Sequence, residues 1–138
     1  MSEQDHLELV QRAYEVFAKG DLPALLDLLT GDVEWNYHPT YAGMPSAQHP
    51  WRGREGVLKA FQMLTEALEL EAFQPDEFIA GKDKVVVLGH ERDRVKATGR
   101  VVKAEWVQVF TLREGKISQY REYNDTAAWD AGYSSATS

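Results

Sequence analysis

The chain has no cysteine, which excludes disulfide bonds and thiolate metal sites. It also has no apolar stretch near the roughly 20 residues that a membrane-spanning helix needs. Residues Met1 to His6 are polar and acidic, and they have neither the basic start nor the apolar run of a secretory signal. We therefore expect a cytoplasmic protein.

Basic residues are in deficit, with 15 Lys and Arg against 22 Asp and Glu and a net charge of -7 at pH 7. A surface of this sign repels phosphate backbones, so we predict no nucleic-acid partner and no membrane partner. The locally basic segment from Glu91 to Arg100 is interpreted as a solvated hairpin tip. The four histidines have no metal-ligand spacing, which favours a protein without a bound metal. Phosphate-cradling loops, nucleophile elbows and dinucleotide fingerprints are missing too, so we predict no cofactor.

The residues that are present suit one folded domain over 1–138, since 43% are hydrophobic. Helical spacing of apolar residues predicts a first helix that ends at Gly20 and a short, leucine-rich second helix that Asp21 caps. A third helix is predicted after Gly53. The apolar positions that carry the first and third predictions are Leu7, Val10, Tyr14 and Phe17, then Val57, Phe61, Leu64 and Leu68.

Strand-like alternation begins at Val33 and dominates the second half of the chain. The predicted strands are Val33–Tyr37, a less certain one near Glu71–Ala80, Lys84–Lys96, Val101–Leu112 and Ile117–Asn124. Helices followed by an antiparallel meander predict an α+β fold, in which about three N-terminal helices pack on one face of a curved sheet. A short helix after Asp125 ends the chain, and the long loop from His38 to Gly53 is expected to border a binding pocket.

The opposite face of this sheet is expected to be partly apolar, because it would carry Val101, Val107, Val109 and Ile117. An exposed apolar sheet face is typical of an interaction surface. The simplest interpretation is a homodimer formed through this face.

The pocket is predicted from strand alternation. The even positions of Val101–Leu112 hold the large aromatic residues and are expected to face the helices, and the even positions of the last strand join them across the hairpin. This places Gln108 and Glu122 in an aromatic cavity. The residues predicted to bind the substrate there are Trp35, Tyr37, His38, Trp51, Trp106, Gln108, Phe110 and Tyr120.

Glu122 is the predicted catalytic base, because burial raises the pKa of a carboxyl toward the range of general acid–base catalysis. Glu91 is expected at similar depth on the neighbouring strand, and His90 is a further candidate for the proton path. Two carboxyls in one site titrate apart, so one holds a proton while the other accepts one. The alternative is structural: both glutamates are exposed or salt-bridged, with Arg92 or Arg121 paired to Glu122.

Five segments of the sequence together resemble the SnoaL-like polyketide cyclases, within the nuclear transport factor 2-like superfamily that includes ketosteroid isomerases and limonene epoxide hydrolases. They are VQRAYEVFAKGD (10–21), GDVEWNYHP (31–39), WRGREGV (51–57), VQVFTLREGK (107–116) and YREYND (120–125). The resemblance implies a cone-shaped α+β barrel closed by a curved sheet, which typically dimerises through the sheet. It also implies a carboxylate base, for which Glu122 is the nearest match.

The enzymes of this superfamily match only in part. Ala13 and Tyr37 stand where ketosteroid isomerases have their phenol and their general-base aspartate, so steroid isomerisation by that mechanism is not expected. The two aspartates of limonene epoxide hydrolases would fall at Glu122 and Glu91, but Gly89 stands in place of their arginine.

Two hypotheses follow. In the favoured one, the protein is a cofactor-free acid–base enzyme of the isomerase, cyclase, hydratase or hydrolase type that acts on a small apolar substrate. In the other, it is a non-catalytic module that binds a small ligand or dimerises.

Overall fold

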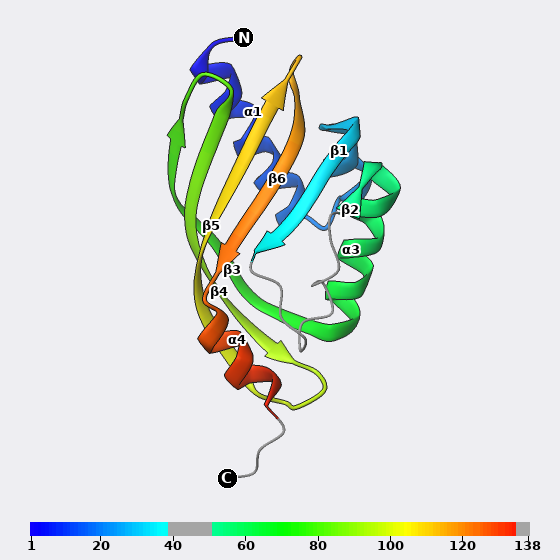
Figure 1. Ribbon diagram of the computed structural model, residues 1–138, viewed down its shortest axis with the longest axis vertical. Coiled ribbons are helices and arrows are strands. Elements are labelled where there is room, and N and C mark those ends of the chain that lie inside the picture. Colours follow the sequence, from blue (N-terminus) through cyan, green and yellow to red (C-terminus); the bar gives the residue numbers. More distant parts are fainter. Residues whose placement is uncertain (39–50, 135–138) are drawn as a thin grey trace.

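The computed structural model describes residues 1–38 and 51–134. Its helices cover the two ends and one face of a single curled sheet (Figure 1). The elements in chain order are α1 (Glu3–Ala18), α2 (Leu22–Asp27), β1 (Leu29–His38), β2 (Trp51–Arg52), α3 (Gly53–Ala67), β3 (Leu68–Ala80), β4 (Lys84–Val95), β5 (Val101–Arg113), β6 (Lys116–Asn124) and α4 (Thr126–Tyr133).

The helix boundaries follow from local capping chemistry. Ser2 begins α1 with a capping box, because its side chain accepts from the backbone of Asp5 and the Asp5 carboxylate accepts from the backbone of Ser2. Gly20 ends the helix region in the left-handed conformation, with φ at 71°. Asp21 then caps α2 through the backbone N–H of Ala24. The predicted end of the first helix at Gly20 and the predicted cap of the second helix at Asp21 are confirmed.

The sheet has the strand order β2-β1-β6-β5-β4-β3. All neighbouring strands are antiparallel except β1 and β6, which run parallel. Helix α1 packs against β3 and β4, α3 packs beside β1, and α4 packs on β5 near the lower end of the molecule in Figure 1. The predicted α+β class with a curved, mainly antiparallel sheet is confirmed.

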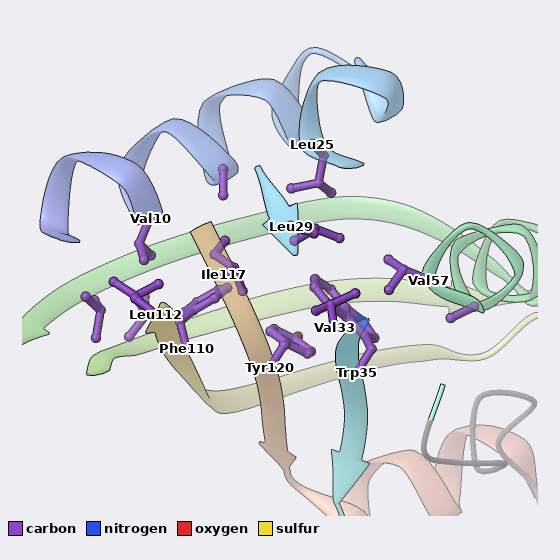
Figure 2. Close-up of a cluster of buried hydrophobic side chains, with 14 of the residues drawn as sticks. Val10, Leu25, Leu29, Val33, Trp35, Val57, Phe110, Leu112, Ile117 and Tyr120 are labelled. Carbon is purple, nitrogen blue, oxygen red and sulfur yellow. The ribbon is translucent and has the colours of Figure 1, made fainter. Parts of the chain in front are cut away.

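The main core lies between the helices and the inner face of the sheet, with Val10, Leu29 and Val57 fully buried (Figure 2). The even positions of β5 are buried, as the alternation predicts: Trp106, Phe110 and Leu112 lie in this core, and Val102 and Ala104 lie in a second cluster with Trp129 of α4. Ile117 also lies in this core and not on the outer face, so its predicted position was wrong. A register shift after Thr111 pairs Ile117 with Leu112. The side chains of the first residues of β6 therefore point to the opposite face from the one that regular alternation predicts.

The outer face of the sheet keeps Val101, Val107 and Val109 half-buried, and Tyr123 beside them is 42% exposed. The expected homodimer through this face stays a prediction, because the structure contains one chain. Within residues 1–38 and 51–134, no helix is long and apolar enough to span a membrane.

Candidate active site

A cavity of about 250 Å³ lies between the inner face of the sheet and helices α1 and α3. This volume is slightly below the range of about 300–1,000 Å³ that is typical of small-molecule sites. Aromatic and aliphatic side chains form most of its wall. Its polar lining residues are Tyr14, Tyr37, Thr65, Glu91, Asp93, Gln108, Tyr120 and Glu122.

Glu122 occupies the centre of the hydrogen-bond network in this cavity. Its Oε1 accepts from Gln108 Nε2 at 2.8 Å and from the Tyr120 hydroxyl at 3.0 Å, and its Oε2 accepts from Asn124 Nδ2 at 3.4 Å. The residue is only 6% exposed. Burial raises the pKa of the Glu122 carboxyl, while these three donors lower it because they stabilise the ionised form.

Asn124 joins Glu122 to Glu91 through a single amide group. Its Nδ2 also donates to Glu91 Oε1 at 3.2 Å. The orientation of the amide is set from the other side, where Oδ1 accepts from Trp129 Nε1 at 2.9 Å and from the Asp125 backbone N–H at 2.8 Å. Helix α4 therefore directs both amide protons of Asn124 toward the two glutamates.

Glu91 and Asp93 are neighbours on the inner face of β4, two residues apart. Burial raises the pKa of Glu91 well above its usual range, and negative charge on Glu122 and Asp93 adds to the rise. Burial also raises the pKa of Asp93 to about 7. Asp93 is 1% exposed, and no N–H or hydroxyl group of the described residues donates to either of its oxygens. Its side chain contacts the Glu91 carboxyl, and this contact offsets part of the rise in the pKa of Asp93.

Tyr14 reaches the same network from α1. Its hydroxyl donates to Gln108 Oε1, which leaves Gln108 Nε2 to donate to Glu122. The Tyr14 ring stacks parallel to Trp106 at a centroid distance of 6.2 Å and lies edge-on to Phe110 at 5.8 Å. Burial raises the pKa of Tyr14 far above its usual value, so the phenol stays a donor.

The structure brings most of the predicted site residues to the cavity. Glu122 and Glu91 are there with Trp35, Tyr37, Gln108, Phe110 and Tyr120. The Trp35 and Tyr120 rings stack at 3.9 Å, and Trp35 Nε1 donates to the Tyr37 hydroxyl at 2.9 Å. Their roles in binding a substrate stay predictions.

Other predicted site residues lie elsewhere. His90 points to the outer face of β4, where its Nδ1 is 2.7 Å from Asp76 Oδ2, so the geometry corrects its assignment to the proton path. Trp106 is buried but does not line the cavity, because Phe73 and Tyr14 stack on it and its ring fills the space beside Gly89.

Trp51 lies in β2, opposite Trp35, and packs against the main core without lining the cavity. The rim loop was predicted from His38 to Gly53. Residues 39–50 and the side chain of His38 lie outside the described residues, and the end of the predicted loop is wrong because Trp51–Arg52 form β2 and Gly53 begins α3.

The predicted arginine partners of Glu122 do not reach it. Arg92 donates to Glu71 at 2.7 Å on the outer face, and Arg121 is exposed there. Two functional candidates were missed, Asp93 and Tyr14. Alternation from Glu91 places Asp93 on the same face, and the apolar stripe of α1 includes Tyr14, so both signals were present in the sequence.

No three His, Asp or Glu side chains in the described ranges are grouped so that they could hold a metal ion. Three carboxyls nevertheless share the cavity. Phenol and amide donors lie beside them. Carboxyl groups with such donors are the groups that general acid–base catalysis uses.

The sequence profile of the SnoaL-like domain matches residues 10–120. The chain belongs to the SnoaL-like domain family. An NTF2-like protein from Burkholderia xenovorans LB400 is 29% identical to this SnoaL-like chain, with a TM-score of 0.84 over 97% of this chain and 99% of that one. An NTF2-like protein of unknown function from Burkholderia pseudomallei K96243 is 27% identical, with a TM-score of 0.83 over 97% and 99% of the two chains.

TerC, solved as a co-crystal with polyporic acid, is 25% identical to this SnoaL-like domain. Its TM-score is 0.82 over 94% of this chain and 98% of that one. No curated protein matches the chain significantly. The predicted family and superfamily are thus confirmed, and the chemistry has to be argued from the site.

Proposed function

We propose that this SnoaL-like domain is an acid–base enzyme that needs no cofactor and acts on a small, largely apolar substrate in the cavity. The observation that carries the proposal is the unequal supply of hydrogen-bond donors to three buried carboxyls. Counting N–H and hydroxyl donors within the described ranges, Glu122 accepts from three, Glu91 accepts from one, and Asp93 accepts from none.

The difference in the number of hydrogen-bond donors supports one carboxyl as the base and the other two as acids. Donors to a carboxylate stabilise its charge, so Glu122 is the first of the three to ionise and serves as the base. Glu91 and Asp93 keep their protons to higher pH, because burial and the charge of Glu122 raise the pKa of both. A carboxylate base and a protonated acid in one apolar cavity form the pair that proton abstraction and return require.

The cavity restricts the substrate class. Its volume of about 250 Å³ admits a small molecule, and aromatic rings from α1, β1 and β5 form much of the wall. Isomerisation, intramolecular aldol-type cyclisation and hydration each need one base and one acid near such a substrate. The co-crystal of TerC, which has the same fold, with polyporic acid supports a small organic molecule as the ligand.

The test has two stages. A thermal-shift screen of apolar carbonyl compounds, epoxides and polyporic acid identifies ligands, since a compound that binds the folded protein raises its melting temperature. Each ligand that binds is then assayed for turnover with wild type, Glu122→Gln and Glu105→Gln. Glu105 is a matched control because it is an exposed glutamate on the outer face of β5.

The proposal requires that Glu122→Gln loses turnover while it still binds the ligand and that Glu105→Gln behaves as wild type. The alternative, a non-catalytic binding module, gives ligand binding without turnover in all three proteins. Unchanged turnover by Glu122→Gln would remove Glu122 as the base.

A further inference from the structure

The charge balance of the cavity is one-sided. Its wall carries three carboxyls, and no Lys, Arg or His is found among its lining residues in the part of the chain that the structure describes. The nearest arginines on β4, Arg92 and Arg94, lie on the outer face and pair with Glu71. A ligand that enters this cavity therefore meets acidic groups without any built-in counter-charge.

Asp93 is the carboxyl that the protein leaves without a donor. It is 1% exposed, and neither Oδ1 nor Oδ2 accepts a hydrogen bond from an N–H or hydroxyl group of any described residue, so the neighbouring Glu91 carboxyl is its one polar contact there. A buried polar group that lacks a partner costs free energy, which native proteins rarely tolerate without a functional reason. The missing donor is most simply supplied by a ligand, because Asp93 lines the cavity.

The position of Asp93 suits a group that enters through the open side of the cavity. Leu70 pairs with Asp93 across the β3–β4 ladder, lines the cavity and is 48% exposed. Thr65, at the end of α3, is the other exposed lining residue. Asp93 thus lies just inside an opening, and the aromatic wall continues from it toward Phe73, Tyr14 and Phe110.

An alkylammonium group matches these features better than a neutral or anionic group. It carries a positive charge and three N–H donors, enough for both oxygens of Asp93 and one of Glu91. A carboxylate or phosphate would be repelled by Glu122 and would leave Asp93 without a donor.

We infer that the Asp93 end of the cavity binds the ammonium group of a small amine whose apolar body lies against the aromatic wall. The inference rests on the proposed function only in taking this cavity as the substrate site, and it names the substrate class. Glu91 completes the anionic surface, and Glu122 lies further along the cavity, beyond the ammonium group.

The experiment compares three probes of one shape: benzylamine, benzyl alcohol and benzoate. Binding is measured by isothermal titration calorimetry with wild type, Asp93→Asn and Asp76→Asn. Asp76 is a matched control, since it is an exposed aspartate on the outer face that pairs with His90. Benzyl alcohol binding by Asp93→Asn reports that the cavity is intact in that variant.

We expect benzylamine to bind wild type at least tenfold more tightly than benzyl alcohol, and benzoate to bind most weakly. Asp93→Asn should bind benzylamine about tenfold more weakly than wild type and should bind benzyl alcohol with wild-type affinity. Asp76→Asn should bind both compounds with wild-type affinity. Equal or tighter binding of benzyl alcohol or benzoate by wild type would overturn the inference. So would undetectable benzylamine binding at millimolar concentration, or an unchanged benzylamine affinity in Asp93→Asn.

The pH dependence gives a second readout. Benzylamine, like a lysine side chain, stays protonated up to pH 8, whereas Asp93 with its pKa of about 7 is mostly neutral at pH 6. Affinity should therefore rise about tenfold between pH 6 and pH 8. The titratable groups around Asp93 that share in this response are Glu91 on β4, Glu122 on β6, Glu71 on β3 and Tyr133 on α4.

An affinity for benzylamine that stays constant or falls over this range would contradict the inference. The outcome is independent of catalysis. If Glu122→Gln kept full turnover while benzylamine bound as predicted, the proposed function would fail and the amine site would stand. If Glu122→Gln lost turnover while benzylamine failed to bind, the proposed function would stand and the amine site would fail.

Discussion

Replacing Asp93 with asparagine should stabilise the protein at high pH and change its stability little at low pH. Asparagine keeps the shape of the side chain and removes the ionisable group. In the folded protein the pKa of Asp93 is raised to about 7 by burial, against 3.8 for the free side chain. The folded state therefore holds a proton on Asp93 between pH 4 and pH 7 that the unfolded chain has already released.

The sign and size of the effect follow from this difference. Stability falls as pH rises whenever the folded state binds more protons, so wild type loses stability between about pH 4 and pH 7. A difference of about 3 pH units corresponds to at most about 4 kcal/mol, and we expect about 2 kcal/mol because the surroundings of a buried carboxylate relax around its charge. Asp93→Asn has no ionisable group at this position and does not lose this stability. Its free energy of unfolding should be about 2 kcal/mol higher than that of wild type at pH 8.

Urea unfolding of wild type, Asp93→Asn and Asp76→Asn at pH 4.5, 6, 7 and 8 measures this. The stability difference between Asp93→Asn and wild type should be small at pH 4.5, should increase up to about pH 7 and should change little between pH 7 and pH 8. Asp76→Asn should show no such increase. A variant that is less stable than wild type at pH 8, or a difference that does not depend on pH, would refute the reasoning about Asp93.

Two further predictions concern Glu122 and its supporting residues. In Glu122→Gln, turnover of an identified substrate should fall by about 10²–10⁴-fold with little change in ligand affinity, because a positioned base contributes that much to proton transfer. Steady-state kinetics measure this change. A variant that loses only ligand affinity and keeps its turnover rate would speak against Glu122 as the base. Trp129→Phe keeps an aromatic ring but removes the donor to Asn124 Oδ1. Without this donor the Asn124 amide is free to rotate, and its hydrogen bond to Glu122 should weaken. The pKa of Glu122 should then rise, and the protein should lose about 1 kcal/mol of stability. Carboxyl ¹³C NMR detects the pKa change, and an unchanged pKa of Glu122 would show that α4 does not orient the amide.

The inner face of β5 was predictable because alternation is regular there. Trp106, Gln108 and Phe110 are all buried, as the period of two requires. Ile117 was misplaced because a register shift at the β5–β6 turn is not visible in the alternation of either strand. The sequence pattern therefore determines faces within a strand better than it does across a turn.

The acidic cluster was predicted only in part. Glu91 was placed in the cavity, but Asp93 was interpreted with Arg92 and Arg94 as part of a solvated tip, because neighbouring charges usually mark exposed chain. In the structure the strand alternates through this segment, with Asp93 inside and both arginines outside. His90 was misplaced for a different reason: it is adjacent to Glu91 on β4, so the alternation directs its side chain to the opposite face.

Tyr14 shows why a family comparison by position has limits. It lies one residue from the place where ketosteroid isomerases have their phenol, which argued against a role. The helix nevertheless directs its hydroxyl to Gln108 and from there to Glu122. Contacts between α1 and β5 are set by the packing of the whole core, which the sequence of one element does not specify.

The central claim is that three carboxyls in one cavity are held in different protonation states near neutral pH. Carboxyl ¹³C NMR of protein labelled at Asp and Glu, titrated from pH 3 to pH 9, tests it most directly. The account predicts an aspartate resonance that titrates near pH 7, disappears in Asp93→Asn and is retained in Asp76→Asn. If every aspartate and glutamate resonance titrated between about pH 3 and pH 5, as exposed carboxyls do, the acid–base assignment of the cavity would be contradicted.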